Sequence, residues 1–195
     1  MSLSEVFSIL TGVTFAISAG WYTIDVAKKK VTASVATFIM LTVINISNMA
    51  SLIAENSWGP VPFTAVGTTA SFLIVLFAIR NRHIYFELPD KIGLIGALIG
   101  LTIWFITDNA TTNLYVIAIV ETIVFLPLII KSFKEPNLET TLPWQINLLA
   151  STFLLLTINS MAAAVWIVPV RQFLCSFSLN IGLLRGKITS KKNKS

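Results

Sequence analysis

Long apolar blocks make up most of this chain, and they restrict its fold more than any other feature. Each block has roughly 17–25 residues, which is the length that crosses a bilayer as a helix. Inside lipid every backbone N–H and C=O needs an internal partner, so blocks of this kind form helices. The pattern predicts seven spans, at 6–27, 32–54, 62–80, 91–107, 113–130, 144–160 and 163–184.

Composition favours a membrane protein over a soluble domain. Of the 195 residues, 55% are hydrophobic and 12% are charged, whereas a soluble protein has about 25% charged residues. The net charge of +5 does not indicate nucleic-acid binding, because Lys and Arg lie at block ends rather than on one face. Cys175 is the only cysteine, so we expect no disulfide framework within the chain. His83 is the only histidine and has no partner ligands, so we expect no metal site. We also expect no cofactor.

Positive charge alternates from loop to loop. The loops after the first, third and fifth spans, together with the C-terminal tail, hold 13 of the 14 Lys and Arg residues. The loops after the second and fourth spans hold none. Because positively charged loops stay on the cytoplasmic side, we expect the N-terminus outside and the C-terminus in the cytoplasm.

Two segments of 18 residues, 21–38 and 127–144, have the same layout. Each contains a helix end, a basic loop and the next helix start, and each closes on an aromatic residue, Phe38 or Trp144. Four spans separate the copies, so both have the same orientation, as in the parallel repeats of several transporters. We expect an all-α membrane protein with a first triple-helix bundle at 1–82, a linker helix at 83–110, a second bundle at 111–186 and a basic cytoplasmic tail at 187–195.

This plan resembles the SWEET / PQ-loop / KDEL-receptor superfamily of triple-helix-bundle repeats, and most closely its prokaryotic SWEET-like members. In the first repeat Trp21 and Ala33 stand where prolines are usual, and no Pro-Gln dipeptide is present. The resemblance implies alternating access of a small polar solute between two bundles, in a prokaryotic plasma membrane. The pattern of these SWEET-like proteins is a helix that ends in proline, a basic loop with lysine and proline, and then tryptophan. The second repeat matches it at Pro127, Lys131, Pro136 and Trp144.

Glu121 and Arg171 interrupt the fifth and seventh spans. Each lies eight residues into its span, so both lie about 12 Å deep. A charge at a helix centre costs about 2.5–3.5 kcal/mol on the insertion scale, so each needs a partner or water. Because both spans belong to the second bundle, we expect an ion pair. The pair either fixes helix register or borders a central cavity, where a solute or a proton on Glu121 competes for the arginine.

Other polar residues in the spans are candidates for solute binding. Asn45 and Asn48 share a helix face, where buried amides hold a polar solute or join helices. The resemblance implies that the third helix of each repeat lines the pocket, which adds Thr68 and Arg171. Asn180 lies deeper in the last span and is a candidate gate. Helix packing is the alternative role for each of these residues.

Prolines, glycines and tryptophans offer further roles. Pro127 and Pro169 fall inside spans, where a proline kinks the helix and serves as a hinge or as a static bend. Gly96 and Gly100 form a GxxxG pair on the fourth span, which packs within the protomer or joins a homo-oligomer. Trp144 lies near a span end, where an interfacial anchor is the expected role.

These observations favour a transporter or facilitator of a small polar solute, with a central cavity bounded by spans one, two, three, five, six and seven. The alternatives are a ligand-binding receptor or sensor on the same fold, and an accessory subunit of a larger complex, which would lack an internal cavity. The sequence has no His/Cys cluster, HExxH motif, P-loop or nucleophile elbow, so we do not expect an enzyme. A retinal protein would need a mid-membrane lysine in the last span, where this chain has Arg171. The expected partners are the solute and the lipid bilayer.

Overall fold

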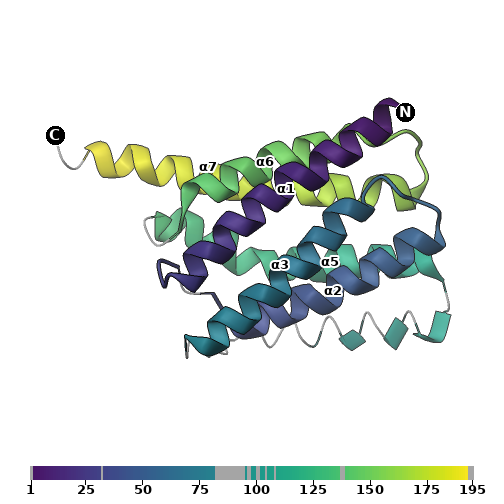
Figure 1. The fold of residues 1–195 in the computed structure, drawn as a ribbon, viewed down its shortest axis with the longest axis horizontal. Helices are drawn as coiled ribbons and strands as arrows, with labels where there is room; N and C mark the ends of the chain where they lie inside the picture. The colour runs from purple at the N-terminus through teal and green to yellow at the C-terminus, as the bar shows by residue number, and fades with distance from the viewer. Residues whose placement is uncertain are drawn as a thin grey trace.

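The computed structural model describes residues 2–31, 33–81, 109–136 and 139–192, with short pieces between 95 and 107, and within these residues it is all helical, without a strand. The helices lie side by side along the long axis, with the two termini at opposite ends (Figure 1). The expected fourth span at 91–107 falls largely outside the described residues, as do Gly96 and Gly100. The helices are α1 (Leu3–Ala27), α2 (Val35–Ala54), α3 (Val61–Arg80), α5 (Ala110–Lys134), α6 (Thr141–Leu155) and α7 (Ala163–Lys192).

Capping side chains determine where several helices begin. The Ser2 hydroxyl accepts a hydrogen bond from the Glu5 amide at 3.2 Å, and the Glu5 carboxylate accepts one from the Ser2 amide at 2.8 Å. This is a capping box, which satisfies two amides that lack a partner within the helix. Asn109 Oδ1 accepts from the Thr112 amide at 2.9 Å, so α5 begins at Ala110, three residues before the expected 113.

Five of the described helices are long and apolar enough to cross a membrane: α1, α2, α3, α5 and residues Ala163–Arg185 of α7. Large apolar side chains such as Ile17, Phe72 and Ile119 are exposed on the outer faces, whereas polar side chains such as Thr11 and Asn113 are fully buried. A soluble protein has the opposite arrangement, because its apolar groups leave water for the core. The chain is therefore an all-α integral membrane protein.

The expected sixth span at 144–160 runs past the end of its helix. Helix α6 runs from Thr141 to Leu155, and its 15 residues are fewer than the roughly 20 that cross a bilayer. Its end has a local cause: the Thr157 hydroxyl and amide both donate to the Leu154 carbonyl, at 2.7 and 3.1 Å, so the chain turns there. At the other end of the chain, α7 continues to Lys192 and includes most of the expected tail at 187–195.

The described helices pack in a closed ring. In the first bundle, which we define as α1, α2 and α3, α3 packs against both α1 and α2. In the second bundle, α5, α6 and α7, α7 packs against both α5 and α6. The ring closes where α1 packs on α6 and α2 packs on α5. The interface between the bundles therefore runs along the length of the molecule.

Glycines allow close approach within each bundle. A Cβ on Gly12 of α1 would lie 3.0 Å from the Pro62 side chain of α3. A Cβ on Gly182 of α7 would overlap the Ser132 side chain of α5, and it would lie 2.9 Å from the Phe133 ring. Small residues of this kind are common where membrane helices pack tightly.

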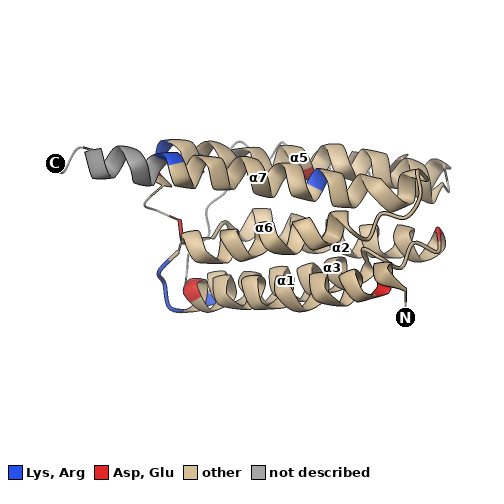
Figure 2. Ribbon diagram, turned by 90° about the horizontal axis from the view of Figure 1, so that it is seen from above, with Lys and Arg blue, Asp and Glu red and all other residues tan. Residues whose placement is uncertain are grey.

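The two ends of the molecule differ in charge. Figure 2 shows basic residues gathered at the end where the C-terminus lies, which we call the basic end. The opposite end, called the N-terminal end, has the loops 55–60 and 156–162. The basic end carries Lys28, Lys29, Lys30, Arg80, Lys131, Lys134 and Arg185.

Candidate functional site

A cavity of about 760 Å³ lies between the two bundles. Side chains from all six described helices line it, and these are the helices at the expected spans one, two, three, five, six and seven. It extends from Glu121, near the middle of α5, to the exposed Lys134 and Glu135 at the basic end. This volume is in the usual range for small-molecule sites, about 300–1,000 Å³.

The interface beyond the cavity, toward the N-terminal end, is filled. Leu52 of α2 and Leu114 of α5 are fully buried and pack in one apolar cluster with Ile167 of α7. Asn113 donates to the Ser47 hydroxyl at 3.0 Å and to the Ser51 hydroxyl at 2.6 Å. These contacts join the two bundles, so the interface is sealed at one end and hollow at the other.

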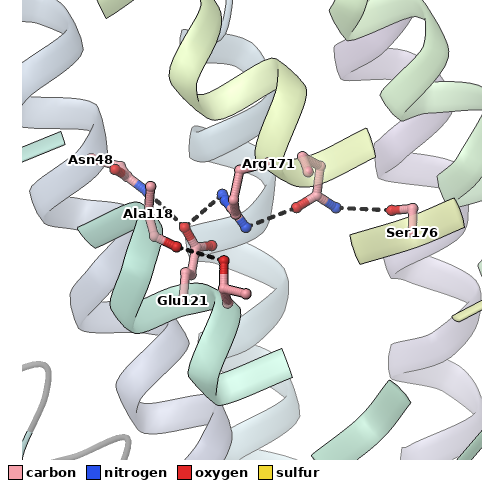
Figure 3. Close-up of polar contacts among 7 residues, drawn as sticks. Asn48, Ala118, Glu121, Arg171 and Ser176 are labelled. Atoms are coloured by element: carbon pink, nitrogen blue, oxygen red, sulfur yellow. Dashed lines mark hydrogen bonds and ion pairs between the residues drawn. The ribbon is translucent and has the colours of Figure 1, made fainter. Parts of the chain in front are cut away.

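Glu121 and Arg171 form the expected ion pair. Arg171 Nη2 lies 2.5 Å from Glu121 Oε2, and both side chains are more than 90% buried. Asn48 Nδ2 of the first bundle donates to the same oxygen at 3.1 Å (Figure 3). A buried charge needs both a counter-ion and hydrogen bonds, and Glu121 Oε2 has the two together. The carboxylate therefore links both helices of the pair to α2 across the interface.

Further hydrogen bonds extend this network through the second bundle. Arg171 Nη1 donates to Gln172 Oε1 at 3.1 Å, and Gln172 Nε2 donates to the Ser176 hydroxyl at 3.3 Å (Figure 3). Asn147 of α6 donates to the same hydroxyl at 3.2 Å. The charge pair is thus part of a chain of polar side chains on α2, α5, α7 and α6, and Glu121, Asn147 and Gln172 also line the cavity.

Three polar groups face the cavity near its deep end. Asn45 and Ser71 are 7% and 6% exposed and line the cavity, and neither side chain makes a hydrogen bond to a described residue. The ion pair and the Asn48 hydrogen bond of Glu121 both use Oε2, and Glu121 also lines the cavity. Gly67 makes room for the Asn45 amide, because a Cβ there would lie 3.2 Å from Nδ2.

The cavity is bordered at the basic end by a second ion pair and by aromatic rings. Lys131 Nζ lies 2.8 Å from Glu139 Oε1, and the Glu139 side chain is buried. Trp144 packs edge-on against Tyr22 with ring centroids 5.5 Å apart, and both rings line the cavity. The Trp144 ring therefore joins α6 to α1, and its expected anchoring role stays a prediction.

The other predicted residues do not line the cavity. Asn48 and Arg171 lie behind Glu121, and Thr68 donates to the Thr64 carbonyl of its own helix at 2.9 Å. Asn180 donates to the carbonyls of Trp144 and Ser176, at 2.9 and 2.8 Å, so it joins α7 to α6.

The predicted hinge prolines both fall within helices. Pro127 lies in α5 and Pro169 inside α7. Their hinge role stays a prediction.

Sequence reasoning missed Gln172, Asn147 and Glu139. Gln172 had one usable signal, because it follows Arg171 directly in the sequence. Asn147 and Glu139 had no signal that separates them from ordinary helix-contact and loop residues. Within the described residues, no group of three or more His, Cys, Asp and Glu side chains could hold a metal ion.

No protein family, curated protein or solved structure matches this chain at a significant level.

Proposed function

We propose that the protein is a SWEET-like transporter or facilitator that carries a small polar solute across the membrane by alternating access between its two bundles. The observation that carries this proposal is the cavity between the bundles. The cavity extends to exposed residues at the basic end, and packed side chains close it toward the N-terminal end. A solute site between two rigid bundles is what alternating access requires. An accessory subunit needs no such cavity.

The packing order of the helices supports a parallel repeat. In each bundle the third helix packs between the other two, and the bundles meet through α1 with α6 and α2 with α5. Exchange of the two bundles leaves this order of contacts unchanged. Helices α1 and α5 also have the same length, 25 residues. The proposal includes seven spans, with α6 as a short sixth span of 15 residues and the segment 83–110 as the linker between the repeats.

Orientation follows from the positive-inside rule. With the basic end in the cytoplasm, the N-terminus lies outside and the cavity faces inward. The structure then corresponds to an inward-facing state. In the outward-facing state, the seal formed by Asn113 with Ser47 and Ser51 would open.

Glu121 is suited to couple the solute to this movement. Its Oε2 is bound by Arg171 of its own bundle and by Asn48 of the other bundle. When the bundles rock against each other, the bond to Asn48 is the one that changes. A solute held by Glu121 would shift the balance between the two states, because a ligand favours the state that it binds more tightly.

Cysteine accessibility tests the proposed state directly. Cys175 is buried and is the only cysteine, so Cys175→Ser provides a background for single cysteines. Ala70→Cys places a thiol in the cavity, and Ala164→Cys places one in the seal. An impermeant maleimide should label Ala70→Cys from the basic side only, and Met161→Cys, which is exposed at the N-terminal end, from the other side. Labelling of Ala70→Cys from both sides alike would contradict an inward-facing state.

Transport itself is tested by a ligand screen followed by flux. A thermal-shift screen against sugars, nucleosides, vitamins, amino acids and organic acids identifies binders, since a ligand of the folded state raises its melting temperature. Each binder is then assayed for uptake into proteoliposomes. A transported solute should also increase the labelling of Ala164→Cys from the N-terminal side. Tight binding without flux and without this labelling would instead support a receptor or sensor.

A further inference from the structure

The deep end of the cavity brings together three polar groups that have no partner among the described residues on their cavity side. Asn48 contacts Glu121, and Asn45 lies one helical turn from Asn48 toward the basic end. The Asn45 amide lies over Gly67, and Ser71 lies one turn further along α3. Asn45, Ser71 and Glu121 therefore line the same cavity from three helices, with Asn45 one turn from the Asn48 that contacts Glu121.

Glu121 is the charged residue that lines this part of the cavity, and its carboxylate is paired with Arg171 behind it. Glu121 lines the cavity, whereas Arg171 contacts its Oε2 and does not line the cavity. The Asn45 amide and the Ser71 hydroxyl can each accept a hydrogen bond as well as donate one. A carboxylate solute would meet the negative oxygen, whereas an ammonium group would form a charge-assisted hydrogen bond with it.

Aromatic rings complete the site. Phe15 and Phe63 stack with centroids 4.1 Å apart and line the cavity, and Phe125 lies on the opposite bundle. The faces of such rings attract cations and also cover the hydrocarbon part of a ligand. The lining residues of the first bundle include no charged residue, so nothing on that wall repels a cation.

The charges nearer the basic end do not exclude a cation either. Lys131 and Lys134 line the cavity together with Glu135 and Glu139, so the positive and negative charges there are equal in number.

We propose that Glu121, Asn45 and Ser71 bind the ammonium group of a small solute, with its hydrocarbon part against the aromatic rings. This inference rests on the proposed function only in taking the cavity as the solute site. The ammonium group belongs either to a simple amine or to a zwitterion, and the zwitterion would offer its carboxylate to a further donor.

Calorimetry on the purified full-length protein tests the proposal with ligands of matched hydrocarbon size: n-butylammonium, n-butanol, butyrate and the zwitterion norvaline. We expect saturable binding of n-butylammonium or norvaline, and binding of n-butanol and butyrate at least roughly tenfold weaker. Binding of both ammonium ligands assigns the site to the ammonium group alone. If norvaline binds and n-butylammonium does not, the site recognises an ammonium group that lies beside a carboxylate. The proposal is overturned if neither binds, or if n-butanol binds as tightly.

Variants test the position of the site. Ser71→Ala and Asn45→Ala should each lower the affinity for the ammonium ligand by roughly tenfold, because each variant removes an acceptor for a charged donor. Thr69→Ala is the matched control, since Thr69 is exposed on the same helix and does not line the cavity. Because Glu121→Gln alone would leave Arg171 without its counter-ion, the neutral double variant Glu121→Gln with Arg171→Gln is used, and it should abolish binding. Unchanged affinity in all three variants would overturn the assignment.

These measurements do not depend on transport. Ammonium binding without flux would contradict the proposed function and leave this site standing. Flux of a neutral sugar, with no binding of either ammonium ligand, would support the transporter and overturn the ammonium site.

Discussion

The two ends of the interface between the bundles are built from the same helices and yet pack differently. Toward the N-terminal end, Asn113 bonds to Ser47 and Ser51, and the Ser57 hydroxyl donates to the Ala164 carbonyl at 3.0 Å. Toward the basic end the bundles enclose the cavity. The bundles are in contact at both ends, but only toward the basic end do those contacts surround a cavity.

Side-chain size accounts for much of this difference. Small hydroxyl residues at the N-terminal end let the backbones approach closely and still satisfy buried polar groups. At the basic end the facing residues include the rings of Tyr22, Phe38 and Trp144, which contact one another across the interface or within the first bundle. The Ser18 hydroxyl, which donates to the Pro143 carbonyl at 2.7 Å, ties α1 to α6 there. These bulky side chains therefore border the cavity at the basic end.

The largest expected effect concerns the charge pair, which lies where the sealed part of the interface meets the hollow part. Arg171→Met would leave Glu121 buried without its counter-ion and should lower the free energy of unfolding by about 3–5 kcal/mol. The double variant Glu121→Gln with Arg171→Met removes both charges and should regain most of that loss. Unfolding in mixed micelles with increasing SDS measures both. A double variant as unstable as Arg171→Met alone would show that the pair matters through packing rather than through charge.

A second, smaller effect is expected inside the second bundle. It tests whether helices of one bundle pack tightly at the basic end, where the interface between the bundles holds the cavity. Gly182→Ala should destabilise the protein by about 1–3 kcal/mol, because its Cβ would overlap Ser132 where α7 meets α5. Gly20→Ala is the control, since a Cβ there meets no atom within 4 Å, and it should be neutral or stabilising by up to about 1 kcal/mol. If Gly182→Ala behaves like Gly20→Ala in the same titration, the second bundle is itself loosely packed at this end.

The features that could be predicted from the sequence are those that depend on the residues of single helices in an apolar environment. Hydropathy placed α1, α2 and α3 within about three residues, because lipid requires long apolar helices. The ion pair was predictable because Glu121 and Arg171 each needed a partner in an apolar environment.

The remaining features depend on tertiary packing, which hydropathy does not contain. Asn45 and Asn48 share a helix face, but only the structure assigns Asn48 to Glu121 and leaves Asn45 toward the cavity, over Gly67. Trp144 near a helix start suggested a lipid anchor, and only the structure places its ring against Tyr22 in the cavity wall. The end of α6 at Leu155 comes from hydrogen bonds of Thr157 within an otherwise apolar run.

The seal at the N-terminal end should depend on its buried hydrogen bonds. Asn113→Ala removes the bonds to Ser47 and Ser51, and bonds of this kind contribute about 0.6 kcal/mol each on average, so we expect a loss of about 1–2 kcal/mol. Labelling of Ala164→Cys from the N-terminal side should increase in the same variant. Asn159→Ala, at an exposed asparagine of the same end, is the control and should change neither quantity. A stable variant with unchanged labelling would mean that apolar packing alone closes this end.

The smallest expected effect separates buried from exposed contacts within the same seal. The Thr111 hydroxyl donates to Glu55 Oε1 at 2.5 Å, which also joins α5 to the first bundle, but this bond lies at the surface. Thr111→Val should change the free energy of unfolding by no more than about 0.5 kcal/mol, because polar surroundings compete for both groups. Labelling of Ala164→Cys should stay as in the parent protein. A loss as large as that of Asn113→Ala would place the closing contact at the rim, where solute could reach it, rather than in the buried layer beneath.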